Sequence, residues 1–416
     1  MSIKTLIKKV AKLENISASF LEKQVKNNKA VILSNYKRNI PKPIAIGEGL
    51  KIKINTNIGT STKKDDIEEE LKKLKVAIEN GTHTVMDLSV GKDLEKTRKM
   101  ILKNSTVPVG TVPIYEAAVK CKERDGDFDK LTFDDIWEVL KKQAQEGVDF
   151  FTIHAGILKK SLDILKEEKR VCGIVSRGGA ILARWMYVNN KENPLYENFK
   201  HILSLAKKYN ITLSLGDALR PGSIADSTDK LQLFELNVIS ELVKLCIKNG
   251  VSAMVEGPGH IKINEVAFNV ELEKKLCFGA PFYLLGPLVT DIAAGYDHIS
   301  ASIGASIAAL YGADFLCVVT PAEHLRHPTV DDIKDGLIAF RIAAHSVDLL
   351  RFKDEFYKDY NLSIYRAKRD WKNMFENLID KDRSKKYRGD IEDNLDLCSM
   401  CGDYCSLKVI ENCNLL

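Results

Sequence analysis

From residue 82 onward one pattern repeats along the chain: a short apolar run rich in β-branched residues, a turn with polar residues or glycine, and a helical stretch. The eight runs are HTVMDLS, TVPVGTVP, VDFFTIHAG, CGIVSRGG, ITLSLGD, SAMVEGPGH, APFYLLGP and ADFLCVVTP. Strands that are joined by crossover helices pair in parallel, and eight such units suit a closed barrel better than an open sheet. We therefore predict an α/β fold, a (β/α)8 TIM barrel, with a doubly wound sheet as the alternative.

The stretches between the runs carry the apolar repeat of amphipathic helices. Helices are expected at residues 133–146, 158–169, 197–208, 231–249, 263–275, 302–310 and 330–350. Before the barrel, residues 1–45 indicate short helices and turns, residues 51–58 alternate as a strand does, and residues 65–80 predict an amphipathic helix. We expect three parts: an N-terminal helical and strand region over 1–81, a barrel catalytic domain over 82–352, and a C-terminal helical segment with a cysteine motif over 353–416.

Composition and charge exclude several classes of function. The chain has 416 residues, 45% of them hydrophobic and 29% charged, which is typical of a soluble globular enzyme. The net charge is +5 and the lysines are scattered, so nucleic-acid binding is not indicated. The N-terminal MSIKTLIKKVAKLEN has no signal-peptide run, and the longest apolar stretch, 301–319, is broken by Asp314 and two glycines. We expect a cytoplasmic protein that contacts neither nucleic acid nor a membrane.

The cysteines are unevenly distributed. Five of the nine stand alone within apolar segments, which argues against a disulfide framework, and the other four crowd into the C-terminal tail. Cys398, Cys401 and Cys405 have the spacing Cys-x2-Cys-x3-Cys, and Cys413 follows. Thiolates at this spacing can bind zinc, with Cys413 as the fourth ligand, or a four-iron cluster whose open iron can bind S-adenosylmethionine. Ordinary free thiols are the third interpretation.

Polar side chains stand at the C-terminal end of every predicted strand. Because a barrel places these ends on one rim, where the loops build the active site, we expect them to lie together. Loop residues are often polar simply because loops are exposed to solvent, but coincidence of this kind is a weak explanation for all eight strands. The rim residues are Asp87, Tyr115, His154, Ser176, Arg177, Gly178, Asp217, Glu256, His260, Tyr283, Thr320, Glu323 and His324.

Two of the predicted rim loops suit an anion. Arg177 lies beside glycines ahead of a helix, and Arg220 stands in a similar loop, so both could bind a phosphate or instead fix the rim by salt bridges. No Walker A loop and no Gly-x-Gly-x-x-Gly follows a strand, so nucleotide hydrolysis and dinucleotide binding are unsupported.

Metal and proton chemistry have candidates at the same rim. His260 and His324 would form an open two-imidazole metal site, unless each only bonds a neighbouring loop. Cys317 could donate a hydrogen atom if it points into the barrel, and is otherwise a small buried hydrophobe. A general acid or base could be any of Asp87, Asp217, Glu256, Asp291 and Glu323.

Several ordered motifs resemble one family, the phosphomethylpyrimidine synthases of thiamine biosynthesis. The motifs are NTNIGTS, TVMDLS, PVGTVPIY, FTIHAG, GIVSRGG, LSLGDALRPGSIAD, MVEGPGH, GAPFYLLGPLVTDIAAGYDH, VTPAEHL and CSMCGDYCSLK. The resemblance implies an atypical radical S-adenosylmethionine lyase: a barrel, a C-terminal segment with a [4Fe–4S] cluster, a zinc ion and a homodimer. It also implies conversion of 5-aminoimidazole ribotide into 4-amino-5-hydroxymethyl-2-methylpyrimidine phosphate, with electrons from a donor such as flavodoxin or ferredoxin.

The resemblance also implies roles for residues at matching positions. Zinc would be bound by His260 and His324, and the cluster by Cys398, Cys401 and Cys405, leaving Cys413 as a bystander. We expect catalytic roles for Glu256, Asp291 and Cys317. The expected substrate contacts are Asn57, Met86, Tyr115, His154, Ser176, Arg177, Gly178, Asp217, Arg220, Glu256 and Tyr283.

The chain departs from the family pattern at several points. Three residues separate Cys401 from Cys405 where the long bacterial members have four, and the large N-terminal insertion of those members is missing. Other departures are Ala218, Lys262, Ala294, Val318, and Arg326-His327 in place of the common Gly-Leu. Such changes either tune the pocket or mark the paralogue that makes 5-hydroxybenzimidazole, for a cobamide lower ligand, from the same ribotide.

Overall fold

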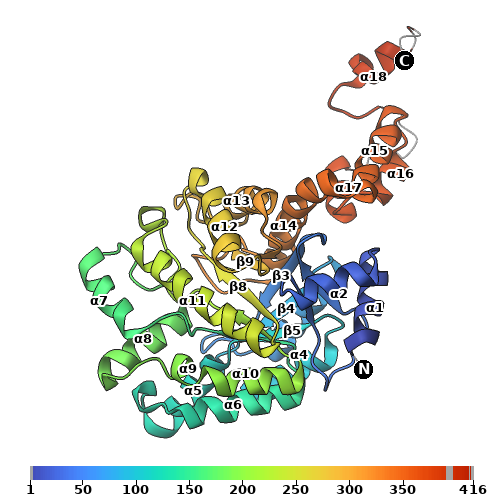
Figure 1. The fold of residues 1–416 in the computed structure, drawn as a ribbon. Coiled ribbons are helices and arrows are strands. Elements are labelled where there is room, and N and C mark those ends of the chain that lie inside the picture. Colours follow the sequence, from blue (N-terminus) through green and yellow to red (C-terminus); the bar gives the residue numbers. More distant parts are fainter. Residues whose placement is uncertain (1–2, 390–396, 412, 414–416) are drawn as a thin grey trace. The chain divides into compact units, whose positions relative to one another are not determined.

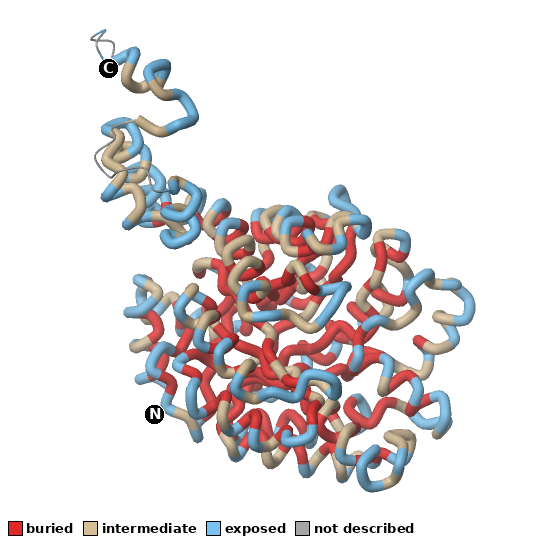
Figure 2. Tube along the Cα trace, turned by 180° about the vertical axis from the view of Figure 1, so that it is seen from behind, coloured by how far each residue is buried: buried red, intermediate tan, exposed pale blue. Residues whose placement is uncertain are grey.

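A computed structural model describes the chain except for residues 1–2, 390–396, 412 and 414–416. It contains two compact units, Met1–Ala344 and His345–Leu416. Figure 2 shows buried residues concentrated in the interior of the first unit, whereas the described residues of the second are mostly exposed or intermediate. The hydrophobic core therefore belongs to the first unit.

A closed barrel of parallel strands is the centre of the first unit (Figure 1). Around the barrel the strands are β3 (Lys53–Ile58), β4 (Thr84–Asp87), β5 (Val109–Thr111), β6 (Phe150–Ile153), β7 (Thr212–Leu215), β8 (Ala253–Gly257), β9 (Phe282–Leu285) and β10 (Phe315–Cys317). β10 pairs with β3, with Phe315 opposite Lys53, and this pairing closes the barrel. The predicted (β/α)8 TIM-barrel fold is confirmed.

Helices surround the barrel, and several of them begin and end where the sequence supplies caps. For example, the Thr132 hydroxyl and the Asp135 carboxylate form a capping box at the start of α6, and Gly147 ends it in the left-handed conformation. After β3 the helices of this unit are α3 (Ile67–Glu79), α4 (Leu94–Asn104), α5 (Pro113–Asp125), α6 (Phe133–Glu146), α7 (Lys159–Glu168), α8 (Arg177–Asn189), α9 (Pro194–Glu197), α10 (Phe199–Tyr209), α11 (Lys230–Asn249), α12 (Val266–Leu276), α13 (Asp297–Tyr311) and the first part of α14 (Val330–Arg351), whose residues from His345 onward belong to the second unit.

Two expectations about the strands differ from the structure. The predicted strand at residues 172–179 is wrong, because Gly173 adopts φ +57° and the Ser176 hydroxyl accepts the Gly179 N–H to start α8. The strand expected at residues 51–58 in the N-terminal region is instead β3, a member of the barrel. The barrel thus has the expected number of strands with one member exchanged.

The N-terminal region contains a small sheet that the sequence did not indicate. Helices α1 (Ile3–Glu14) and α2 (Ala18–Lys26) precede an antiparallel pair, β1 (Ala30–Leu33) with β2 (Ile44–Gly47).

This region is tied to the starting ends of several barrel strands. The Asn28 amide donates to the carbonyl of Ala253 and accepts its N–H, both at 3.0 Å. Arg38 bonds the Asp149 carboxylate at 2.7 Å and the Val107 carbonyl at 3.1 Å, next to β6 and β5. These buried contacts place the N-terminal region over the end of the barrel opposite the loops that follow the strands.

The second unit contains short helices with few buried side chains. They are α15 (Lys353–Ala367), α16 (Trp371–Glu376), α17 (Lys381–Arg388), the 3₁₀ turn η4 (Gly402–Tyr404) and α18 (Ser406–Glu411). On α15 the exposed rings of Phe356, Tyr357 and Tyr360 contact one another. Across the described part of the whole chain, none of the helices has both the length and the apolar character of a membrane span.

Candidate active site

A pocket lies at the C-terminal ends of the barrel strands. It gathers most of the side chains that the sequence nominated as substrate contacts, from all eight strands or the loops that follow them. The predicted residues that line it are Asn57, Met86, Tyr115, His154, Asp217, Arg220, Glu256, Tyr283 and Cys317. Leu88, Val112, Thr152 and Leu285 line it as well and were not predicted.

Glu256 is the acid of this pocket. One carboxylate oxygen accepts hydrogen bonds from the hydroxyls of Thr152, at 2.7 Å, and Ser214, at 2.6 Å. Burial, and then the negative charge of Asp217, raise the pKa of Glu256 to about 8. The carboxyl group is therefore largely protonated at neutral pH and can donate a proton or a hydrogen bond.

Thr152 and Ser214 are polar positions that sequence reasoning overlooked. They stand on the neighbouring strands β6 and β7 and pair directly with each other across the sheet. A signal existed, because a hydroxyl interrupts the apolar runs FFTI and TLSL at matching positions. A polar residue buried inside a barrel needs a partner, and here that partner is Glu256.

Asp217 and Arg220 form an ion pair on the loop after β7. Arg220 donates to the Asp217 carboxylate at 2.8 Å. Burial raises the pKa of Asp217 although the positive charge of Arg220 opposes that shift. The loop thus presents a guanidinium, held by its own acid, at the pocket wall, where it could bind an anion.

His154 is a buried, neutral histidine. Burial, and then the positive charge of Arg220, lower its pKa to about 3. Its Nε2 lies 3.1 Å from the Ser176 hydroxyl, and its Nδ1 has no hydrogen-bond partner in the described structure. A Cβ at Gly178 would lie 2.7 Å from this Nδ1, so glycine is needed where α8 begins above the ring.

The turn of Ser176, Arg177 and Gly178 therefore supports the pocket wall from behind. The Arg177 guanidinium lies 4.8 Å from the centre of the Tyr115 ring, a cation–π contact, and donates to the Leu88 carbonyl at 3.3 Å. All three residues of the turn contact pocket residues, although they are not among those that line it.

Cys317 points into the barrel rather than outward. Its sulfur accepts a hydrogen bond from the Asn57 amide at 3.2 Å, and the Asn55 amide lies 3.7 Å away. Burial raises the pKa of the thiol to about 12, so the sulfur keeps its proton. A neutral S–H facing the pocket has the state that a hydrogen-atom donor requires.

His260 and His324 lie together at the same rim. Their ring centres are 5.2 Å apart, and each Nδ1 bonds a carboxylate: His260 with Asp291 at 2.8 Å, and His324 with Asp297 at 3.0 Å. Such carboxylates hold the proton on Nδ1 and leave Nε2 free to bind a metal, so this donor set fits zinc. Asp291 thus contacts His260 rather than lining the pocket, and Asp297 was not predicted.

The three motif cysteines lie in the second unit. The backbone N–H groups of Met400 and Cys401 bond the Cys398 sulfur and lower its pKa, and the Gly402 N–H bonds the Cys398 carbonyl at 3.1 Å. Backbone donors around a thiolate fit a cluster ligand.

No metal-binding group of three or more His, Cys, Asp or Glu side chains occurs among residues 3–389, 397–411 and 413. His260 and His324 are thus paired without a third such side chain beside them in the described structure. The three motif cysteines are close in sequence, but the described structure does not bring them together around one point.

Comparison with known proteins settles the family. A model of the radical SAM ThiC family matches residues 1–412. The chain belongs to this family. Radical SAM ThiC membership implies S-adenosylmethionine and an iron–sulfur cluster.

Relatives in this family share nearly the whole chain. A phosphomethylpyrimidine synthase of Thermodesulfovibrio yellowstonii is 49% identical over 97% of this chain and 95% of its own. Those of Methanocaldococcus jannaschii and Pyrococcus furiosus are 48% and 47% identical, over 97% of this chain and 95% and 94% of theirs. A solved dihydropteroate synthase of Coxiella burnetii aligns with a TM-score of 0.43 and 12% identity, over 76% of this chain and 98% of that one.

Proposed function

We propose that this chain is a phosphomethylpyrimidine synthase, a lyase that converts 5-aminoimidazole ribotide into 4-amino-5-hydroxymethyl-2-methylpyrimidine phosphate in thiamine biosynthesis. The observation that carries the proposal is the match, at 47–49% identity and nearly full length, to proteins of that name. Those names favour the pyrimidine over the 5-hydroxybenzimidazole alternative.

The pocket supplies groups that suit a ribotide. Arg220 would bind the phosphate, because its guanidinium stands at the pocket wall beside Asp217. The Asn57 amide offers a polar contact to the imidazole or the ribose, and the His154 ring forms part of the same wall. Tyr283, stacked on Phe315 with ring centres 4.2 Å apart, presents a fixed aromatic wall.

Proton movement falls to the buried acid and the thiol. Glu256 would hold a proton at its carboxyl, opposite the hydroxyls of Thr152 and Ser214, and deliver it to the substrate. Cys317 would keep its S–H beside Asn57 until a carbon radical of the substrate needs a hydrogen atom. Arg177 and Tyr115 would keep the pocket wall in place and exclude water.

Other residues would hold the cofactors. Cys398, Cys401 and Cys405 would bind the [4Fe–4S] cluster, and His260 and His324 would bind zinc with Asp291 and Asp297 behind them. When bound, the cluster and S-adenosylmethionine supply a 5′-deoxyadenosyl radical. We also propose a cytoplasmic homodimer with a flavodoxin or ferredoxin as the electron donor. The three-part division is kept with one change, which is that β3 belongs to the barrel domain.

The experiment is anaerobic turnover of the ribotide with S-adenosylmethionine and a reductant, with the product identified by mass spectrometry. We expect the phosphorylated pyrimidine together with 5′-deoxyadenosine. A benzimidazole product would instead identify the paralogue. Turnover without S-adenosylmethionine, or a colourless protein with zinc alone in its cysteines, would contradict the radical mechanism.

A further inference from the structure

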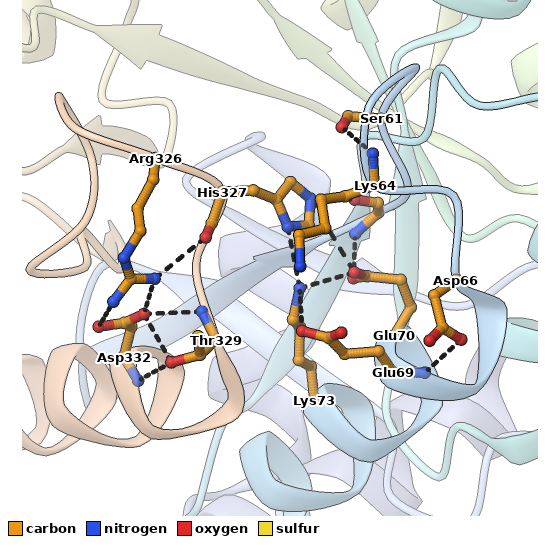
Figure 3. Close-up of polar contacts among 11 residues, drawn as sticks. Ser61, Lys64, Asp66, Glu69, Glu70, Lys73, Arg326, His327, Thr329 and Asp332 are labelled. Carbon is orange, nitrogen blue, oxygen red and sulfur yellow. Dashed lines mark hydrogen bonds and ion pairs between the residues drawn. The ribbon is translucent and has the colours of Figure 1, made fainter.

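Helix α3 carries a completely buried lysine outside the pocket. Lys73 has an exposed fraction of 0%, and its Nζ lies 2.6 Å from a carboxylate oxygen of Glu70 and 3.2 Å from Nδ1 of His327 (Figure 3). The Glu69 carboxylate is farther away, at 3.9 Å. A lysine is almost never fully buried without partners, and two of its partners here come from different segments, α3 and the loop after β10.

Both partners of Lys73 also bond one glycine. The second carboxylate oxygen of Glu70 accepts the Gly59 N–H at 2.7 Å, and Nε2 of His327 lies 2.9 Å from the Gly59 carbonyl. Gly59 has φ +142°, and a Cβ there would lie 2.5 Å from the Ser89 nitrogen. The loop after β3 is therefore held at a backbone position that only glycine fits.

The hydrogen bonds allow one protonation pattern for His327. An ammonium group has donors and no acceptor, so Nδ1 of His327 must accept from Lys73. Nε2 then carries the hydrogen and donates to the Gly59 carbonyl. An apolar side chain at position 327 would remove an acceptor from a buried charge and a donor from a buried carbonyl in one step.

This cluster joins two segments that carry functional candidates. β3 and β10 are neighbours where the barrel closes, and Asn57, two residues before Gly59, donates to Cys317 of β10. His324, three residues before His327, bonds Asp297 and faces His260.

We propose that Glu70, Lys73 and His327 are positioning residues. They fix the loop after β10 to the loop after β3, and thereby hold His324 opposite His260 in the zinc site. The inference rests on the proposed function, because it takes His324 as a zinc ligand.

The test compares His327→Leu with His327→Gln in the anaerobically purified holoenzyme. Leucine should weaken zinc binding by about tenfold or more, the effect of losing an outer support of a metal ligand. Glutamine should restore affinity to within about threefold, because its oxygen can accept from Lys73 while its NH₂ donates to Gly59. Zinc affinity is measured by competition with a chromophoric chelator, and amide hydrogen exchange of the peptide containing Gly59 is measured alongside.

His201→Leu is the matched control, since His201 is exposed on α10 and packs against Trp137. It should leave both readouts unchanged. If His327→Leu does not fold, Glu70→Gln replaces it, because glutamine keeps an acceptor for Gly59 while removing the charge opposite Lys73.

The outcomes separate the two proposals. Faster exchange at Gly59 with unchanged zinc affinity would reduce the cluster to a structural contact and overturn the inference. Equal zinc loss in the leucine and glutamine variants would overturn it too, because the hydrogen bonds would then not be the cause. A wild-type enzyme that makes no pyrimidine would overturn the proposed function while leaving both readouts in place.

Discussion

The barrel pocket and the C-terminal cysteine segment hold their reactive side chains in opposite ways. In the pocket, Glu256 and Cys317 are held by hydrogen bonds from other strands of the barrel, and both are buried deeply enough for their pKa values to shift. In the tail, Cys401 is exposed and Cys398 is held mainly by backbone N–H groups of its own turn.

The two sites differ in whether their side chains are already in position before a ligand binds. The fold itself assembles the pocket, so its groups are in place before any ligand arrives. A cysteine site that local turns alone support takes its final arrangement from the metal that it binds. Losing one ligand should therefore abolish the tail's function, whereas losing one pocket contact should reduce activity by degrees.

The largest effect is expected for Cys398→Ala. Iron content should fall and pyrimidine formation should drop by about a thousandfold or more, because radical generation needs the complete ligand set. Thermal unfolding of the barrel should hardly move, since Cys398 lies outside the barrel unit. Cys413→Ala is the matched control and should keep iron and activity; loss in both variants would show that Cys413 is a ligand as well.

Glu256→Gln should have the next largest effect, a fall in kcat of roughly a hundredfold, as is usual when a general acid is removed. Glutamine keeps an oxygen that can accept from Thr152 and Ser214, so the pocket should remain assembled. Steady-state kinetics checks this, and an unchanged kcat would remove Glu256 from proton transfer.

The same variant should change how stability depends on pH. Burial raises the pKa of Glu256 from 4.5 to about 8, so folding favours its protonated form. That contribution is fully present below the unfolded value and is lost as pH rises through about 8. The stability of Glu256→Gln relative to the wild type should therefore increase from about pH 5 to about pH 9 in urea titrations. Parallel pH curves would contradict the burial of a titrating carboxyl here.

Asp297→Asn is expected to weaken zinc binding by about tenfold, less than His324→Ala, because the carboxylate acts only through the imidazole. The carboxamide fills the same space at this buried position but is a weaker acceptor for the His324 Nδ1–H. Chelator competition measures the change. Asp163→Asn, a change at an exposed position on α7, serves as the control. Equal zinc affinities in the wild type, Asp297→Asn and Asp163→Asn would show that Asp297 does not support zinc binding.

Arg177→Met should have the smallest effect, a rise in the KM for the ribotide of about threefold, which corresponds to the loss of a partly exposed cation–π contact. Methionine keeps most of the aliphatic stem but lacks the charge over Tyr115. A rise of a hundredfold would instead show that Arg177 binds the phosphate directly, as Arg220 is proposed to do.

Much of the fold could be predicted, because the eightfold alternation of strands and helices is a local property of the sequence. The exchange of residues 172–179 for β3 was not predictable in that way. Whether an apolar run becomes a barrel strand depends on its pairing, and β3 pairs with two strands: β4, which follows in sequence, and β10, which is more than two hundred residues away.

In the candidate site, the reactive side chains were predicted and the residues that support them were missed, for a similar reason. Reactive side chains such as Glu256 and His154 stood out by type and by position after a strand. Thr152, Ser214 and Asp297 act by supporting another residue, and their direction depends on strand register and loop path. The contact of Lys73 with His327 spans 254 positions, and no local pattern indicates it.

The N-terminal region covers one end of the barrel, where Asn28 bonds both backbone groups of Ala253 and Arg38 reaches the segments before β5 and β6. These contacts leave the opposite end, where the pocket lies, as the side from which ligands can approach. Substrate and product would then share one doorway, the rim where the strands end, so the order in which they enter and leave becomes part of the catalytic cycle.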